Sequence, residues 1–495
     1  MMEINIAHAE EGGGPPKDQA YAYKWIGISV AAGLLIWLLP TPDDLGTRAH
    51  AFLALLTTVV LLWTSEAIPI GVTSIMVGCG LIIFNIQSSA DAWAPYANRT
   101  VVFVFFIIML GVMLGQTSIP NRIMAWILKI GGTNVKRLSF TLCMGSTVLA
   151  AWTHDATITI ILLYAMMPLF LKMGLTPDKS NNFTKHFMFM IPLSAACGGG
   201  ATFLGSGRSP ASTEMLYQIT GYNIGFMEYM WYQFVPSIFL GLATWVAIMI
   251  IYPPKITVLP GEVSIEKMPP MNRNEKIIAW LLGITFFLWM FTDLTGYHVS
   301  AIGGLFIVAC IMFGVVDWKQ CLADYPWNPI MVFGAGFSLG VTMLDTGAGE
   351  WLASKIFPFF TGMPWPVVAI GASYISAVIT SFMANAAATA LLVPVMVPMA
   401  DMAGTPSVPI AMSVPLATTF VWLVIGCPPT LIAYGFGYFT QWEAFKVFFF
   451  RCIVGVIILT LSQMVWYPIA GMPGNVDLMQ TAANLTPTGF TLIVE

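Results

Sequence analysis

Two ionisable side chains interrupt a long apolar segment of the chain. Thr153-His154-Asp155 lies inside the run 138–171, which is otherwise apolar. Ionisable residues at membrane depth are costly and by default mark a substrate or ion pathway. Adjacent imidazole and carboxylate groups at low dielectric titrate as a coupled pair and can carry a proton, while a carboxylate oxygen can also hold a hard cation. The competing interpretation is a His154–Asp155 hydrogen bond that only fixes the turn.

A similar interruption, Thr380–Thr389 around Asn385, occurs in a second apolar run. Each interrupted run is followed by a segment with a glycine or proline cluster, Gly198–Pro210 with Arg208 in the first half and Gly426–Thr430 in the second. Helix breaks at membrane depth expose backbone carbonyls that can coordinate sodium, and the positive N-terminal end of the next half-helix can face an anion. Simple kinks that allow close helix packing are the alternative interpretation.

The composition places these segments in a membrane. Of the 495 residues, 57% are hydrophobic and only 9% are charged, whereas about 25% of residues in soluble proteins are charged. Repeated apolar runs of about 17–25 residues have the length that crosses a bilayer. The net charge of -4 gives no reason to expect a nucleic-acid partner. The seven cysteines lack paired spacing and predict neither disulfides nor a metal site, and no removable signal peptide is expected at the N-terminus.

The order of the apolar runs predicts an all-α polytopic membrane protein with about eleven transmembrane helices plus two re-entrant hairpins. With a cytoplasmic N-terminus, sixteen of the 20 Lys and Arg residues fall on cytoplasmic segments or their edges, as the positive-inside rule requires. This agreement is lost if either interrupted run is a full crossing. The expected parts are a cytoplasmic tail (1–23), a first repeat (24–252), a cytoplasmic linker (253–276), a second repeat (277–470) and an extracytoplasmic tail (471–495).

The two halves share an order of elements. Ile191-Pro192-Leu193 recurs as Val414-Pro415-Leu416, and the interrupted runs recur at a similar offset. An odd number of crossings between corresponding elements makes the two copies inverted. Inverted-topology repeats with paired broken helices indicate a secondary transporter whose site lies near the bilayer midplane.

The chain from about residue 24 to 470 resembles the divalent anion/sodium symporter family, the dicarboxylate, citrate and sulfate carriers. The resemblance is carried by the order of spans, Glu66–Pro69, the two polar tips, and Gly426–Thr430 followed by Tyr434-Gly435. It implies a Ser-Asn-Thr motif at each hairpin tip, two sodium sites, and an anion held between the tips. It also implies a homodimer whose transport domains move in elevator fashion against a scaffold.

Several positions depart from the family pattern. The first tip reads Thr153-His154-Asp155 where the family has Ser-Asn-Thr, and the second reads Ala384-Asn385-Ala386. Thr380 still offers an oxygen one turn before Asn385, so the second sodium site is expected to persist, while the altered first tip leaves sodium and proton coupling open. Arg208 has three interpretations, because it can bind the anion, pair with Asp155, or extend to the interface with Glu214.

The candidate residues follow from this resemblance. For the anion they are Thr153, His154, Asp155, Thr157, Arg208, Ser209, Asn385, Pro428, Pro429 and Thr430. For sodium they are Thr153, Asp155, Gly200, Thr380, Asn385, Ile425 and Gly426. No cofactor other than coupling sodium ions is expected.

The function expected is sodium-coupled transport of small organic anions, di- or tricarboxylates, across the inner (plasma) membrane. The alternatives are a proton-coupled carrier and an exchanger of dicarboxylate, sulfate or sulfonate without sodium. An intramembrane enzyme is disfavoured because no nucleophile motif or metal-ligand spacing accompanies His154, Asp155 and Arg208. A channel is disfavoured because broken hairpins do not make a ring of like groups along a pore.

Overall fold

The computed structural model describes residues 19–259, 270–292 and 297–474. Within these ranges the chain is helical, and the β-structure consists of one isolated bridge between Asn134 and Val258. The expectations for the two chain ends and the linker fall partly outside the described residues.

Eight of the described helices are long and apolar enough to cross a membrane. In this count, α5, the short 3-10 turn after it and α6 form one continuous stretch. The eight are α2 (Gln19–Leu38), α3 (Thr47–Ser65), α5–α6 (Ser89–Gly115), α9 (Asp155–Lys172), α12 (Phe226–Ile251), α17 (Trp327–Asp345), α20 (Asn385–Met402) and α23 (Gln441–Ala470). Four shorter apolar helices are α4 (Ile70–Ile83), α15 (Val299–Met312), α19 (Trp365–Thr380) and α21 (Ser407–Ala417).

The other helices connect or complete these spans. They are α7 (Ile119–Gly131), α8 (Val135–Trp152), α10 (Asn182–Gly199), α11 (Arg208–Thr220), α13 (Arg273–Met290), α16 (Trp318–Ala323), α18 (Ala348–Ile356) and α22 (Pro428–Gly435). The protein is therefore an all-helical polytopic membrane protein, as the sequence predicted.

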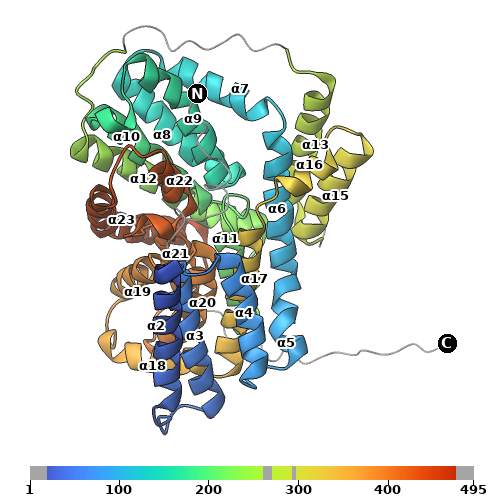
Figure 1. Cartoon of the computed structure of the whole chain (residues 1–495), viewed down its shortest axis with the longest axis vertical. Helices are drawn as coiled ribbons and strands as arrows, with labels where there is room; N and C mark the ends of the chain where they lie inside the picture. The colour runs from blue at the N-terminus through green and yellow to red at the C-terminus, as the bar shows by residue number, and fades with distance from the viewer. Residues whose placement is uncertain (1–18, 260–269, 293–296, 475–495) are drawn as a thin grey trace, which may run out of the picture.

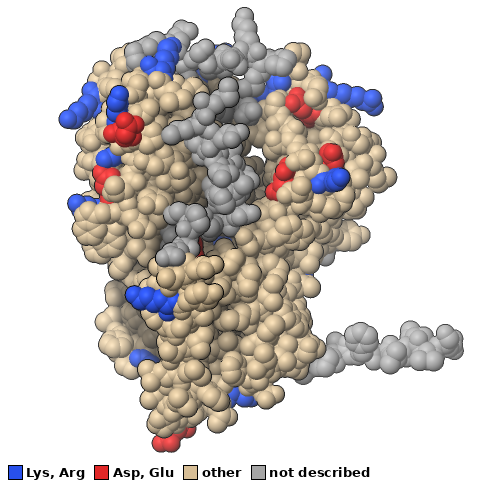
Figure 2. Space-filling view, in the orientation of Figure 1, with Lys and Arg blue, Asp and Glu red and all other residues tan. Residues whose placement is uncertain are grey.

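Large apolar side chains cover much of the exterior. Leu38 is 76% exposed, Ile83 71%, Trp280 75% and Met312 81%. Figure 2 shows a broad surface without Lys, Arg, Asp or Glu on the viewed face, while most charged side chains gather towards one end. A soluble protein rarely exposes so large an apolar surface, whereas a bilayer covers it.

The first interrupted run forms two helices, α8 and α9, separated by Thr153 and His154. The 18-residue helix α10 packs along both of them. Helices α8 and α9 also contact each other directly, as expected if they lie side by side. Figure 1 shows them adjacent in this way. The interruption is therefore a hairpin with a polar tip.

The second interrupted run repeats this arrangement. Helix α19 ends at Thr380 and α20 begins at Asn385, and the short helix α21 packs against both. The two halves also exchange partners: α11 from the first half packs on α20 and α21, while α22 from the second half packs on α9 and α10. This reciprocal packing brings both hairpin tips to the middle of the molecule (Figure 1).

Two boundaries differ from the sequence expectation. Helix α2 begins at Gln19, before residue 24 where the first repeat was expected to start, and α23 begins at Gln441, six residues before the last apolar run (447–469). Thr440 and Glu443 form a capping box that starts α23 ahead of this run. Arg451 lies ten residues inside this helix and is 3% exposed.

Candidate functional site

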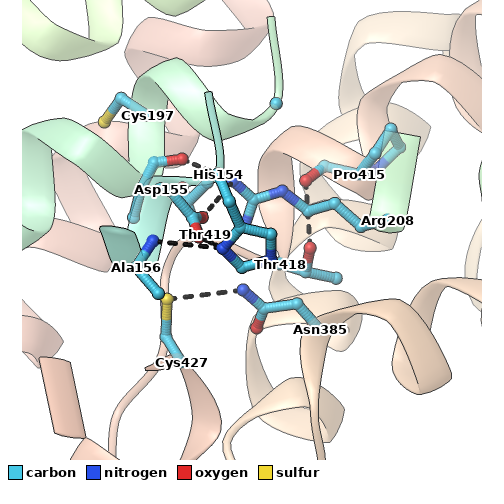
Figure 3. A network of polar contacts seen from close by, with 12 residues as sticks. His154, Asp155, Ala156, Cys197, Arg208, Asn385, Pro415, Thr418, Thr419 and Cys427 are labelled. Carbon is cyan, nitrogen blue, oxygen red and sulfur yellow. Dashed lines mark hydrogen bonds and ion pairs between the residues drawn. The ribbon is translucent and has the colours of Figure 1, made fainter. Parts of the chain in front are cut away.

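Four helices begin at one place between the two hairpin tips. Asp155, Arg208 and Asn385 are the first residues of α9, α11 and α20, and Cys427 directly precedes α22. These residues are linked by contacts described below (Figure 3). Each helix N-terminus carries unpaired N–H groups and a partial positive charge. Their convergence makes this region electropositive before any side-chain charge is counted.

The first tip is held to the break that follows α10. The backbone N–H of Asp155 donates to Gly205 O at 3.0 Å, and the Thr202 hydroxyl donates to Ala151 O. His154 caps α9, since its Nδ1 accepts from the N–H of Ala156 at 3.3 Å. The same Nδ1 lies 3.4 Å from Asp155 Oδ1. The tip is thus fixed by hydrogen bonds to the backbone in which the Asp155 carboxylate takes no part.

Arg208 extends between the two tips. Its side chain is fully buried, and Nη2 donates to Ala196 O and lies 3.6 Å from Asp155 Oδ2. Of the three interpretations of Arg208, extension to the interface with Glu214 is wrong, because Glu214 instead contacts Arg99 Nε at 3.2 Å. The pairing with Asp155 is present in the structure.

Asn385 connects Arg208 to the second break. The amide satisfies its neighbours when its oxygen accepts from Arg208 Nη1 at 2.7 Å and its nitrogen faces Gly426 O at 2.7 Å, Thr380 Oγ1 at 2.8 Å and Thr418 O at 3.0 Å. An amide orientation is assigned from such a network. Figure 3 draws the opposite orientation, in which Nδ2 faces Cys427 Sγ at 3.4 Å.

Three polar atoms of Asp155 and Arg208, between the two tips, lack a hydrogen-bond partner in the described part of the chain. Both carboxylate oxygens of Asp155 and the Nε of Arg208 are buried without a hydrogen-bond partner among the described residues. Buried polar groups are nearly always hydrogen-bonded, so such exceptions indicate a functional site. Gly199 allows the close approach of this pair, because a Cβ there would lie 2.5 Å from Asp155 Oδ2 and 3.0 Å from Arg208 Nη2.

The structure brings together some of the residues predicted from the sequence. Asp155, Arg208, Asn385, Thr380 and Gly426 meet directly. His154 borders them with a side chain that is 23% exposed. Ser209 is fully buried beside Arg208, Pro429 is buried at the start of α22, and Ile425 lies in the 3-10 turn that contains Gly426.

Other predicted residues use their polar groups elsewhere. The Thr153 hydroxyl donates to Leu149 O at 3.0 Å, and the Thr430 hydroxyl donates to Val424 O at 2.8 Å and Cys427 O at 2.7 Å. The carbonyl of Gly200 accepts from Tyr229 at 3.1 Å. Thr157 lies one turn into α9 beside Gly111 of α6, and Pro428 is exposed.

The sequence interpretation missed three participants. Ala196 O and Thr418 O contribute backbone acceptors, which cannot be predicted from a pattern of side chains. Arg451 is the third. Its position ten residues inside a capped apolar helix was the sequence signal that could have identified it. A small pocket beside the first tip is lined mainly by apolar residues together with Thr153 and His154.

Comparisons with known proteins agree with this fold. The chain is 26% identical to an uncharacterized transporter of Haemophilus influenzae over 85% of this chain and 92% of that one. It is 19% identical to the sodium-dependent dicarboxylate transporter SdcS of Staphylococcus saprophyticus over 86% and 88% of the two chains. It is 22% identical to the chloroplastic dicarboxylate transporter 1 of Spinacia oleracea over 75% and 70%.

A solved structure and a family model extend the comparison. The YdaH transporter of Alcanivorax borkumensis shares the fold with a TM-score of 0.53 and 13% identity, over 92% of this chain and 98% of that one. The family model of the sodium:sulfate symporter transmembrane region matches residues 22–472. A match over nearly the whole chain shows that this protein belongs to the sodium:sulfate symporter family of membrane transporters and is not an enzyme.

Proposed function

We propose that the protein is a secondary active transporter of small organic anions, di- or tricarboxylates, and that the anion binds between the two hairpin tips. The observation that carries the proposal is the fully buried guanidinium of Arg208, which contacts Asp155 of one tip and Asn385 of the other. Dicarboxylate is the substrate class in the names of two relatives at low identity.

The electrostatics of the region favour an anion with carboxylate groups. Four helix N-termini direct partial positive charge towards it, and Arg208 keeps Nε free of protein partners among the described residues. A planar guanidinium matches a carboxylate in geometry and can bind it through two parallel hydrogen bonds. An arriving carboxylate competes with Asp155 for Arg208, whose separation of 3.6 Å from Asp155 is longer than a charge-assisted hydrogen bond.

Sodium is the coupling ion that we propose at the second tip. Thr380 Oγ1, Thr418 O and Gly426 O lie within 3.0 Å of one atom of Asn385, so three oxygens converge on one point. Rotation of the Asn385 amide turns its oxygen, instead of its nitrogen, towards these three oxygens. A cation held among them would then have the amide oxygen as a further ligand. Hard cations are held by such sets of carbonyl and hydroxyl oxygens.

Exchange or proton coupling is the second candidate for the energy source. When the Asn385 amide nitrogen faces these three oxygens, its two N–H groups can donate to two of them, which reduces the need for an ion. His154 and Asp155, 3.4 Å apart, can carry a proton between them. Both versions keep the same anion site and differ only in what accompanies the anion.

We also propose an architecture for transport, on the basis of the family resemblance and the order of the apolar segments. The hairpins α8–α9 and α19–α20 with the broken helices form the unit that carries the anion, and α2–α4 belong to the scaffold against which it moves in elevator fashion. We propose two inverted repeats (24–252 and 277–470), about eleven crossings with a cytoplasmic N-terminus, and a homodimer in the inner membrane.

Uptake into proteoliposomes tests the proposal. Radiolabelled succinate, malate, citrate, sulfate and taurine are offered with an inward sodium gradient, a proton gradient, or unlabelled internal anion. We expect saturable uptake of at least one carboxylate by the wild type and its loss in Arg208→Gln. Absence of uptake of every anion under every condition would refute the proposal, as would full activity of a folded Arg208→Gln protein.

A further inference from the structure

A second arginine is buried in the membrane part of the molecule. Arg451 lies ten residues into α23, about 15 Å from the start of that helix, and is 3% exposed. In the part of the chain that the structure describes, no carboxylate pairs with it. A buried cation without an acidic partner is strongly unfavourable, and such residues in membrane proteins are usually functional.

The guanidinium of Arg451 is instead surrounded by neutral acceptors. Nη1 donates to Thr419 O at 2.9 Å, and Nη2 donates to Leu193 O at 3.2 Å and Cys197 Sγ at 3.0 Å. Nε donates to Thr244 Oγ1 at 3.2 Å, and the ring of Phe420 lies 4.9 Å from the guanidinium carbon. The group is thus held in one place by contacts that would suit a cation.

Two of these acceptors belong to the broken helices. Thr419 follows the C-terminus of α21, and Leu193 lies in the last two turns of α10. Helix C-termini carry partial negative charge, and in transporters with broken helices these ends and the adjoining unwound carbonyls coordinate sodium. In this chain a guanidinium contacts the chain just after α21 and a carbonyl in the last two turns of α10 at once.

We propose that Arg451 is a built-in cation that takes the place of a bound sodium ion between the last two turns of α10 and the end of α21. The inference rests on the proposed function, because it concerns the coupling of the same carrier. Arg451 places a permanent positive charge beside these backbone carbonyls, so anion binding needs no sodium at this position. Because Asp155 pairs with Arg208, Arg451 also leaves the buried site with a net positive charge that favours an anion.

The inference predicts that a protein without the guanidinium acquires a cation requirement. Arg451→Ala removes the charge and leaves space between the carbonyls. We expect uptake of the transported anion to fall at least about tenfold, the effect of losing one charge-assisted hydrogen bond. External guanidinium or raised sodium should restore most of the lost uptake in Arg451→Ala. Neither should stimulate the wild type to the same degree.

The experiment compares four proteins in proteoliposomes, each with uptake measured in choline, sodium and guanidinium chloride. Arg451→Lys keeps a charge and should respond to these ions like the wild type at a lower rate. Lys446→Ala removes an exposed charge from the same helix and should leave uptake and its ion response unchanged. If Arg451→Ala is not monodisperse in detergent, Arg451→Gln replaces it, with sodium as the probe.

The outcomes separate this inference from the proposed function. Restoration by guanidinium or sodium only in the neutral variants supports a built-in cation. Wild-type rates in the neutral variants would overturn it, as would a loss that neither ion restores in protein that is still folded. If the wild type takes up no anion under any condition, the proposed function itself fails.

Discussion

The pair of Asp155 and Arg208 gives a prediction that can be worked from its geometry. Both side chains are buried, and the closest charged atoms are 3.6 Å apart. At an effective dielectric constant of 20, two unit charges at that separation attract by about 5 kcal/mol. Removing one partner of a buried pair typically costs about 3–5 kcal/mol, because the other charge is left buried and unpaired. Asp155→Asn and Arg208→Gln should therefore each destabilise the protein severely.

A double-mutant cycle separates this pairing from other effects of the substitutions. We expect Asp155→Asn/Arg208→Gln to be no less stable than the worse single variant, with a coupling energy of at least about 3 kcal/mol. Unfolding free energies come from reversible denaturation in mixed micelles, or from apparent melting temperatures where unfolding is irreversible. The exposed pair Lys355–Asp44 serves as the control, with a coupling of at most about 1 kcal/mol.

Additive losses in this cycle would contradict the account of the site. They would mean that Arg208 is stabilised by Ala196 O and Asn385 alone, and that Asp155 is held by other forces. A coupling energy near zero would also remove the reason to expect that an anion competes with Asp155 for Arg208.

Three further predictions concern the surroundings of this pair. Gly199→Ala places a Cβ 2.5 Å from Asp155 Oδ2 and should lower anion affinity at least about tenfold in a binding titration, whereas Gly283→Ala, with nothing within 4 Å, should not. Thr380→Val removes one of three converging oxygens and should raise the sodium concentration for half-maximal uptake; an unchanged value would exclude sodium there. His154→Asn keeps the cap of α9 and should abolish uptake driven by a proton gradient if the imidazole carries the proton.

The helix breaks were predictable because their causes are local. Polar residues at Thr153-His154-Asp155 and the glycine clusters at 198–207 interrupt helices locally, and Pro428-Pro429 starts a new helix after Gly426, whereas single prolines such as Pro394 stay inside a helix. The long apolar runs likewise set the class of the protein before any contact is known.

The partners at the site were not predictable in the same way. Arg208 meets Asn385 only because α11 of one half packs on α20 of the other, a contact between residues far apart in the sequence. Thr418 and Ala196 contribute backbone carbonyls, whose availability depends on where a helix ends. Arg451 lies ten residues into α23, and its burial depends on the packing of α23 against other helices such as α12, which hydropathy does not show.

A map of the protein bound to its anion tests the central claim most directly. Once uptake has identified a transported carboxylate, a cryo-EM structure at saturating concentration should show its density between the two tips, within hydrogen-bonding distance of Arg208 and Asn385. The distance from Arg208 to Asp155 should lengthen beyond 3.6 Å as the carboxylate takes its place. Density for the anion elsewhere in the protein, with Arg208 unchanged between Asp155 and Asn385, would contradict the account.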